Sequence, residues 1–146
     1  MDSIPEWDPL RPSCISRVPH RGRNMAKPTY QDATLMLQFA QWGATSGLQK
    51  ASAFLWSDKF EIDYKEFLKK YPVGTDEYSY ASQICGWYEP LGTLFKHDLF
   101  NRELLFDWLL VSAVWDRLKR FVLGVREEAK DPRLYEVFEA MAKAQP

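Results

Sequence analysis

Apolar residues recur three and four positions apart through most of the chain, which is the spacing of one face of an α-helix. No segment alternates apolar and polar residues for long enough to predict a β-strand. The first helical segment begins at Thr29 and Asp32, which have the spacing of a capping box. Its apolar positions are Ala33, Met36, Leu37 and Ala40. Gly43 and Gly47 then predict a turn.

Two short helices and one long helix are predicted next. The second helix is marked by Leu48, Ala51, Phe54 and Leu55. Asp63 caps a third, whose apolar face is Tyr64, Phe67, Leu68 and Tyr71, and Pro72 ends it. The fourth begins near Thr75. Its apolar residues keep one helical rhythm across Pro90, so the pattern predicts a single helix with a kink at this proline.

The remaining residues predict two more helices. The fifth is capped by Asn101 and runs from Arg102 to about Ala129, with Gly124 as its weakest point. Asp131 and Pro132 have the residue types of an N-cap and a first helical position. The buried stripe of this last helix is Leu134, Val137, Phe138 and Met141. The prediction is an all-α, single-domain bundle of five to six helices over residues 29–146.

Residues 1–28 form a distinct N-terminal segment. Its apolar residues repeat neither with the 3.6-residue period of a helix nor with the two-residue period of a strand. Five of the nine prolines lie here, and five Lys or Arg residues with no acidic residue lie between Pro9 and Gln31. We expect an irregular or disordered Pro/Arg-rich tail. It has three interpretations: a basic arm for nucleic acid, a strap docked on the helices through Trp7, Leu10 and Ile15, or translated upstream sequence with the functional start at Met25.

Composition narrows the classes of partner. The 146 residues carry 19 basic and 20 acidic side chains, so the net charge of −1 argues against nucleic acid or an acidic membrane as the main partner. The most apolar window, Leu104 to Trp115, is shorter than the roughly 20 residues of a bilayer span. Asp2 and Glu6 stand where a secretory signal has positive charge, and no apolar run follows. A cytoplasmic protein is expected.

The sequence contains no recognisable motif for binding a metal ion or a phosphate group. His20 lies in the tail and His97 follows the fourth helix. Cys14 and Cys85 are split in the same way, and no metal-ligand spacing occurs. Glycine-rich phosphate loops are missing as well. Cys85 lies in the middle of a predicted helix, where a small packed side chain is expected rather than a nucleophile. No cofactor is predicted.

One carboxylate stands out on the predicted fifth helix. At about 100° per residue, Asp107 falls on the same narrow stripe as the apolar residues Val111, Val114, Leu118, Phe121 and Val125. An unpaired buried carboxylate is costly, so a partner is required. The stripe therefore predicts that Asp107 is a buried polar latch, paired with His97 or Lys96 in preference to Arg102. An acid–base or ligand-binding carboxylate is the alternative.

One stretch of the sequence resembles a known family. The matching residues are Trp87-Tyr88-Glu89, Leu91-Gly92-Thr93-Leu94, Lys96-His97 and Leu104 to Trp108, with Phe67, Tyr71-Pro72, Gly74 and Trp115 in addition. This pattern resembles an uncharacterised bacterial family of small all-helical proteins, a domain of unknown function. The resemblance covers about Thr29 to Ala142, and Pro90 departs from it. It implies no activity, only that the segments around Gly92 and Asp107 belong together.

Three functional hypotheses remain open. The first is a helical protein that acts through contact with another protein or a second copy and is not an enzyme, because Trp7, Trp42 and Trp56 exceed what one core needs. The second is a small enzyme or ligand binder that uses Asp107 with His97 or Lys96 in a pocket between helices. The third is contact with nucleic acid through the basic tail.

Overall fold

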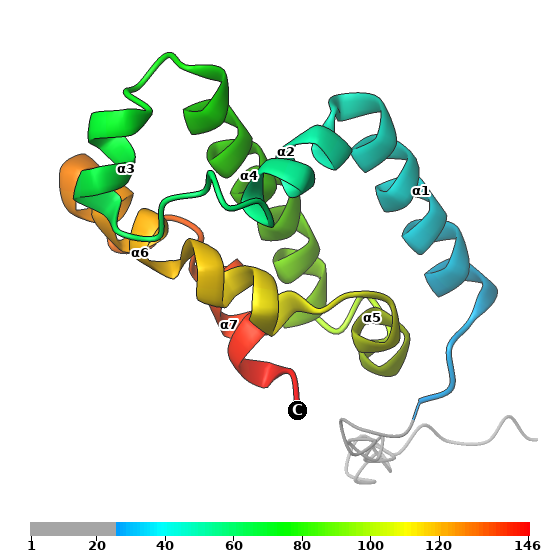
Figure 1. Ribbon diagram of the computed structural model, residues 1–146. Helices are drawn as coiled ribbons and strands as arrows, with labels where there is room; N and C mark the ends of the chain where they lie inside the picture. Colours follow the sequence, from blue (N-terminus) through cyan, green and yellow to red (C-terminus); the bar gives the residue numbers. More distant parts are fainter. Residues whose placement is uncertain (1–25) are drawn as a thin grey trace, which may run out of the picture.

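Seven helices make up the regular structure of residues 26–146, the part of the chain described by the computed structural model (Figure 1). They are α1 (Tyr30–Ser46), α2 (Leu48–Leu55), α3 (Tyr64–Lys70), α4 (Asp76–Lys96), α5 (Arg102–Trp108), α6 (Val111–Ala129) and α7 (Glu136–Ala144). The all-α prediction is therefore confirmed over these residues, and the predicted count of five to six helices is too low. The three interpretations of the N-terminal tail, including Trp7 and Met25, concern residues outside the described part.

Helix α4 is the central element. It packs most extensively against α7 and α2, and α6 packs against α7 (Figure 1). The core between these helices is rich in aromatic side chains, and its largest fully buried members are Phe67, Phe121 and Phe138. Helix α4 continues through Pro90, as its unbroken apolar rhythm predicts.

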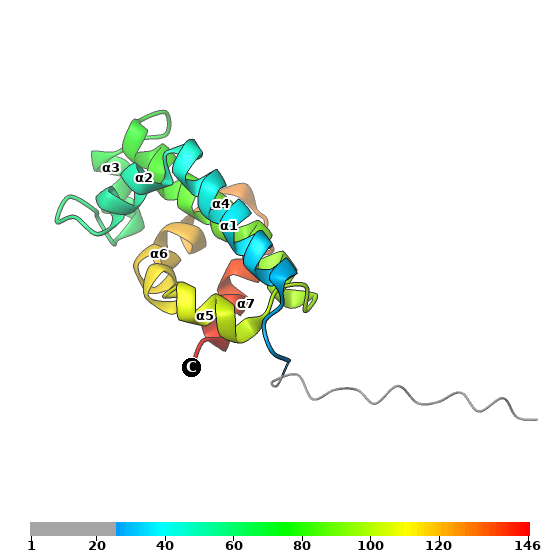
Figure 2. The ribbon, with the colours of Figure 1, turned by 90° about the vertical axis from the view of Figure 1, so that its right-hand side faces the viewer.

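Helix α1 forms the edge of the described structure and is uncovered on its outer side (Figures 1 and 2). The predicted capping box starts it: Thr29 accepts from the backbone N–H of Asp32, and Asp32 accepts in return from that of Thr29. The turn predicted between Gly43 and Gly47 is wrong, because the helix runs through Gly43 and ends at Gly47, where φ is +82°. A Cβ at Gly43 would lie 3.0 Å from Leu48, so glycine is needed there for close packing.

The long fifth helix of the prediction is two helices. The backbone is extended at Leu109, so α5 ends there and α6 starts at Val111. Neither glycine nor proline marks this break. Gln145, just beyond α7, satisfies the backbone groups that the break frees: its amide N–H₂ donates to the Leu109 carbonyl at 2.8 Å, and its amide oxygen accepts from the Ser112 N–H at 2.8 Å.

The last helix starts later than predicted. Asp131 accepts from the backbone N–H of Arg133 in a tight turn, and α7 begins only at Glu136, after Tyr135 in the left-handed conformation (φ +57°). Leu134 therefore precedes the helix and is half-buried. The other predicted core residues of this segment, Val137, Phe138 and Met141, are buried.

Candidate functional site

The buried latch predicted at Asp107 is wrong. Asp107 is exposed, and it forms no hydrogen bond or ion pair with any other residue of the described part of the chain. The stripe from Val111 to Phe121 is buried as predicted. The break at Leu109 interrupts the helical phase, so the side chain four residues before Val111 no longer faces the core. An uninterrupted helix was the incorrect assumption.

Lys96 and His97 are exposed at the end of α4, where they line an open cleft of about 480 Å³. The other wall comes from the α6–α7 connection and the start of α7. The remaining lining residues are Glu89, Thr93, Asp131, Arg133, Glu136 and Val137. Asp107 is not among them. The structure thus brings Lys96 and His97 together with a different carboxylate, that of Glu89.

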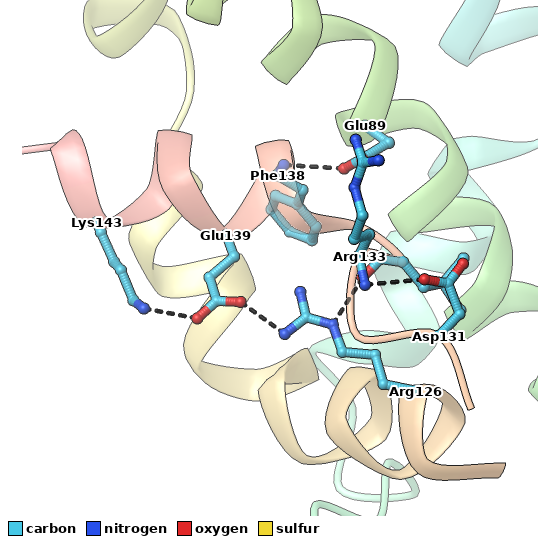
Figure 3. Close-up of polar contacts among 8 residues, drawn as sticks. Glu89, Arg126, Asp131, Arg133, Phe138, Glu139 and Lys143 are labelled. Carbon is cyan, nitrogen blue, oxygen red and sulfur yellow. Dashed lines mark hydrogen bonds and ion pairs between the residues drawn. The ribbon is translucent and has the colours of Figure 1, made fainter. Parts of the chain in front are cut away.

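Glu89 caps helix α7 from a distance of nearly fifty residues along the chain. Its Oε2 accepts from the backbone N–H of Phe138 at 2.9 Å (Figure 3). Phe138 is the third residue of α7, and the preceding Tyr135 provides no side-chain cap. A carboxylate is well suited to this position because the first N–H groups of a helix lack internal partners. Burial raises the pKa of Glu89, although the hydrogen bonds from the α7 backbone oppose this shift.

Gly92, one turn after Glu89, lets α4 and α7 approach each other closely. A Cβ at this position would lie 2.6 Å from the Val137 carbonyl oxygen and 3.0 Å from the Phe138 nitrogen. These neighbours are backbone atoms and cannot rotate away. Glu89 and Gly92 therefore act together, one binding the first turn of α7 and the other making room for it.

A chain of charged residues fixes α7 from its other side (Figure 3). Arg126 of α6 donates to the Leu134 carbonyl at 2.7 Å and to Glu139 of α7 at 2.7 Å. Glu139 also accepts from Lys143 at 2.6 Å. These contacts, that of Lys143 first, hold the pKa of Glu139 below its ordinary value. Arg126, Glu139 and Lys143 are thus occupied in holding the start of α7.

Residues 26–146 contain neither an accessible cysteine nor a cluster of metal-ligating side chains. Cys85 is fully buried in α4, and burial raises the pKa of its thiol. The described residues contain no cluster of three or more His, Cys, Asp or Glu side chains with the geometry of a metal site. In the same part of the chain, no helix combines the length and apolar character needed to cross a membrane.

The outer face of α1 is a second candidate site. Helix α1 has 17 residues, of which Gly43 alone is buried and Asp32 alone is charged. At about 100° per residue, five exposed residues fall within an arc of about 80°. We call them the outer stripe: Tyr30, Ala33, Leu37, Ala40 and Ala44. Beside this stripe runs a row of exposed, uncharged polar residues: Gln31, Thr34, Gln38, Gln41 and Thr45.

The opposite side of α1 is attached firmly to the body. Phe39 packs edge-on against Trp87 of α4 at 5.8 Å, and the Trp87 indole N–H donates to the Phe39 carbonyl at 3.2 Å. Asp32 accepts from the backbone N–H of Asn101 at 2.8 Å, and Gln83 donates to the Ser46 carbonyl. The helix is held at both ends and in the middle. Its outer stripe is therefore presented on a fixed support.

Residues 28–145 match a family described as Domain of unknown function (DUF4760). The chain belongs to this family. No curated protein and no solved structure shows a significant match to the chain. The membership confirms the resemblance to a domain of unknown function and assigns no activity to the DUF4760 chain.

Sequence reasoning missed most of the residues that organise this DUF4760 chain. Glu89 and Gly92 lie within the segments that carry the family resemblance, but their shared contact with α7 depends on a helix distant in sequence. Arg126 and Glu139 lie 13 residues apart, and no local pattern links them. The apolar series of α1 was visible. What it did not reveal is that α1 buries Leu35, Met36 and Phe39 partly and leaves Leu37 exposed.

Proposed function

We propose that this chain is a non-catalytic module that acts through protein–protein contact, and that the outer stripe of α1 is its binding surface. One observation carries the proposal: a helix of 17 residues with a single charge leaves an apolar stripe exposed. Leu37 is 64% exposed and Tyr30 is 95% exposed. Contiguous apolar surface of this kind marks interaction sites, whereas scattered apolar residues do not.

The composition around the outer stripe supports a protein partner. Helices that lie on membrane surfaces carry Lys and Arg on their polar face. The polar row of α1 contains only Gln and Thr and has no Lys or Arg. Asp32 is turned to the body, where hydrogen bonds from Thr29 and Asn101 outweigh the effect of burial and lower its pKa. Charge is thus kept away from the outer stripe.

The other two surfaces are weaker candidates. The cleft at Lys96 and His97 is polar, and its carboxylate Glu89 is engaged by α7. A groove of about 390 Å³ between α6 and α7 has Trp115 and Leu123 in its lining, but its rim charges pair with one another, as Lys143 does with Glu139. Two of the tryptophans that the sequence suggested as surplus to the core lie at the surface: the side chain of Trp42 is 43% exposed and that of Trp56 is 54% exposed.

A cytoplasmic site of action belongs to the same proposal. The sequence has only two cysteines, and Cys85 is a free buried thiol. This cysteine use fits a reducing compartment, in which small domains rely on a hydrophobic core rather than on disulfides.

The experiment compares two variants of the full chain as affinity baits in cells that naturally express it. Leu37→Glu places a charge in the outer stripe, and the matched control Gln38→Glu places the same charge in the adjacent polar row. Both positions are exposed, so both variants should keep the wild-type melting temperature. We expect recovery of specific partners to fall at least about tenfold for Leu37→Glu and to stay near wild type for Gln38→Glu. Equal recovery by all three proteins would contradict the proposal.

A further inference from the structure

We infer that a second copy of this chain is a partner of the outer stripe, with the two α1 helices packed antiparallel around a two-fold axis near Leu37. This inference rests on the proposed function, because it names the occupant of the same surface. The argument comes from the order of side chains along the stripe, their charge and the length of the helix.

The order of side chains is self-complementary when it is reversed. In an antiparallel pair centred on Leu37, Tyr30 of one copy faces Ala44 of the other, and Ala33 and Ala40 lie within one residue of facing each other. Each large end residue thus meets a small one, and the two leucines meet at the axis. The spacing of the stripe alternates between three and four residues, which keeps it on one face of a straight helix pair. Alanines at the flanking positions allow the two backbones to approach closely.

The charge of the surface also fits a second copy. A two-fold interface places each patch against a copy of itself, so a patch that carried charges of one sign would repel the second copy. The outer stripe and the neighbouring Gln/Thr row carry none, and Asp32 is occupied by Thr29 and Asn101. A stripe evolved for a charged partner would carry the opposite charge.

The size of the surface sets the expected strength. Helix α1 is about 25 Å long, so one helix pair buries less than the roughly 800 Å² per partner of a standard stable interface. We therefore expect a dimer that dissociates on dilution. Surfaces of the chain other than α1 need not take part in the dimer, because weak and transient interfaces bury areas at the low end of the range seen for protein complexes.

Sedimentation velocity of the full chain from about 10 µM to about 1 mM tests the association. The weight-average mass should rise toward the dimer with concentration for the wild type and for Gln38→Glu. Leu37→Glu should weaken the self-association at least about tenfold. A wild type that stays monomeric throughout, or a dimer that Leu37→Glu leaves unchanged, would overturn the inference.

Cysteine cross-linking tests the geometry. In a Cys14→Ser background, Leu37→Cys should form a disulfide-linked dimer on mild oxidation, while Gln38→Cys, turned about 100° around the helix, should not. A mixture of Tyr30→Cys and Ala44→Cys should give the mixed product, and Tyr30→Cys alone should give none. Efficient linking of Tyr30→Cys to itself would indicate parallel helices and contradict the inference.

The same variants separate this inference from the proposed function. A monomeric wild type whose recovery of another protein depends on Leu37 would refute self-association and leave the proposed function standing. A monomer without Leu37-dependent partners would refute both. Leu37-dependent sedimentation with phosphatidylcholine or phosphatidylglycerol vesicles would assign the stripe to a lipid surface and refute both as well.

Discussion

The contact between Glu89 and α7 leads to the most specific stability prediction. Glu89→Ala removes the oxygen that accepts from the Phe138 N–H at 2.9 Å. No side chain on α7 replaces it, because Tyr135 provides no cap. Loss of an N-cap acceptor costs about 0.5–2 kcal/mol. Because this acceptor is partly buried, we expect about 2 kcal/mol, which corresponds to a fall in melting temperature of roughly 6 °C for a chain of this length.

Glu89→Gln separates the acceptor from the charge. The amide oxygen can still accept from Phe138, so this variant should lose less than about 1 kcal/mol. Burial raises the pKa of Glu89 above its ordinary value of 4.5, which means that the folded state binds the proton more tightly than the unfolded state does. The contribution of Glu89 to stability is therefore fully present below pH 4.5 and declines as the pH rises through the folded pKa.

Urea unfolding of the wild type, Glu89→Gln and Glu89→Ala at about pH 4 and about pH 7 measures these effects. The stability of Glu89→Gln relative to the wild type should improve toward pH 7, because only the wild type carries this titrating group. Glu127→Ala, an exposed change on α6, is the control and should stay within about 0.5 kcal/mol. The reasoning is refuted if Glu89→Ala is as stable as this control, or if Glu89→Gln is as damaging as Glu89→Ala.

Three further predictions concern stability. Gly92→Ala should lower the free energy of unfolding in urea by at least about 2 kcal/mol, because its Cβ would lie 2.6 Å from the Val137 carbonyl oxygen. Gly86→Ala, which has open space around it, should instead raise the free energy of unfolding by up to about 1 kcal/mol. Gln145→Ala should cost about 2 kcal/mol and increase hydrogen exchange at the α5–α6 junction, since two hydrogen bonds are lost; unchanged exchange would refute its role. Asp107→Ala should leave the melting temperature unchanged, because the side chain is exposed; a large fall would restore the latch.

Local signals in the sequence predicted the helical elements well. The capping residues Thr29, Asp63, Thr75 and Asn101 each accept a backbone hydrogen bond at the start of a helix, as their spacing indicated. Helix α4 crosses Pro90 because its apolar face stays in register on both sides. These features depend on residues within one or two turns, which is the range that periodicity and capping rules describe.

The features that the sequence did not reveal depend on distant partners. Gln145 hydrogen-bonds the Leu109 carbonyl that the break between α5 and α6 leaves free. Glu89 accepts from the Phe138 N–H in the first turn of α7. Neither contact leaves a local signal. The error at Asp107 follows from the first of these, because a helical stripe can be extrapolated only across an unbroken helix. The sequence also did not reveal which apolar residues of α1 face the body. Leu35 and Leu37 fit a helical face equally well, and the choice depends on the packing of α1 against Trp87 of α4.

The most direct test of the proposed binding surface is a photo-cross-linking scan along α1 in cells. A benzophenone amino acid replaces each residue from position 33 to position 44 in turn, and the adducts are identified by mass spectrometry. The yield of adducts should follow the helical period of about 3.6 residues, with maxima at the outer-stripe positions 33, 37, 40 and 44, lower yields in the adjacent Gln/Thr row, and minima at positions 35, 39 and 42 on the opposite side of the helix. A uniformly low yield along the helix, or maxima in the Gln/Thr row, would contradict the assignment of the outer stripe as the binding surface.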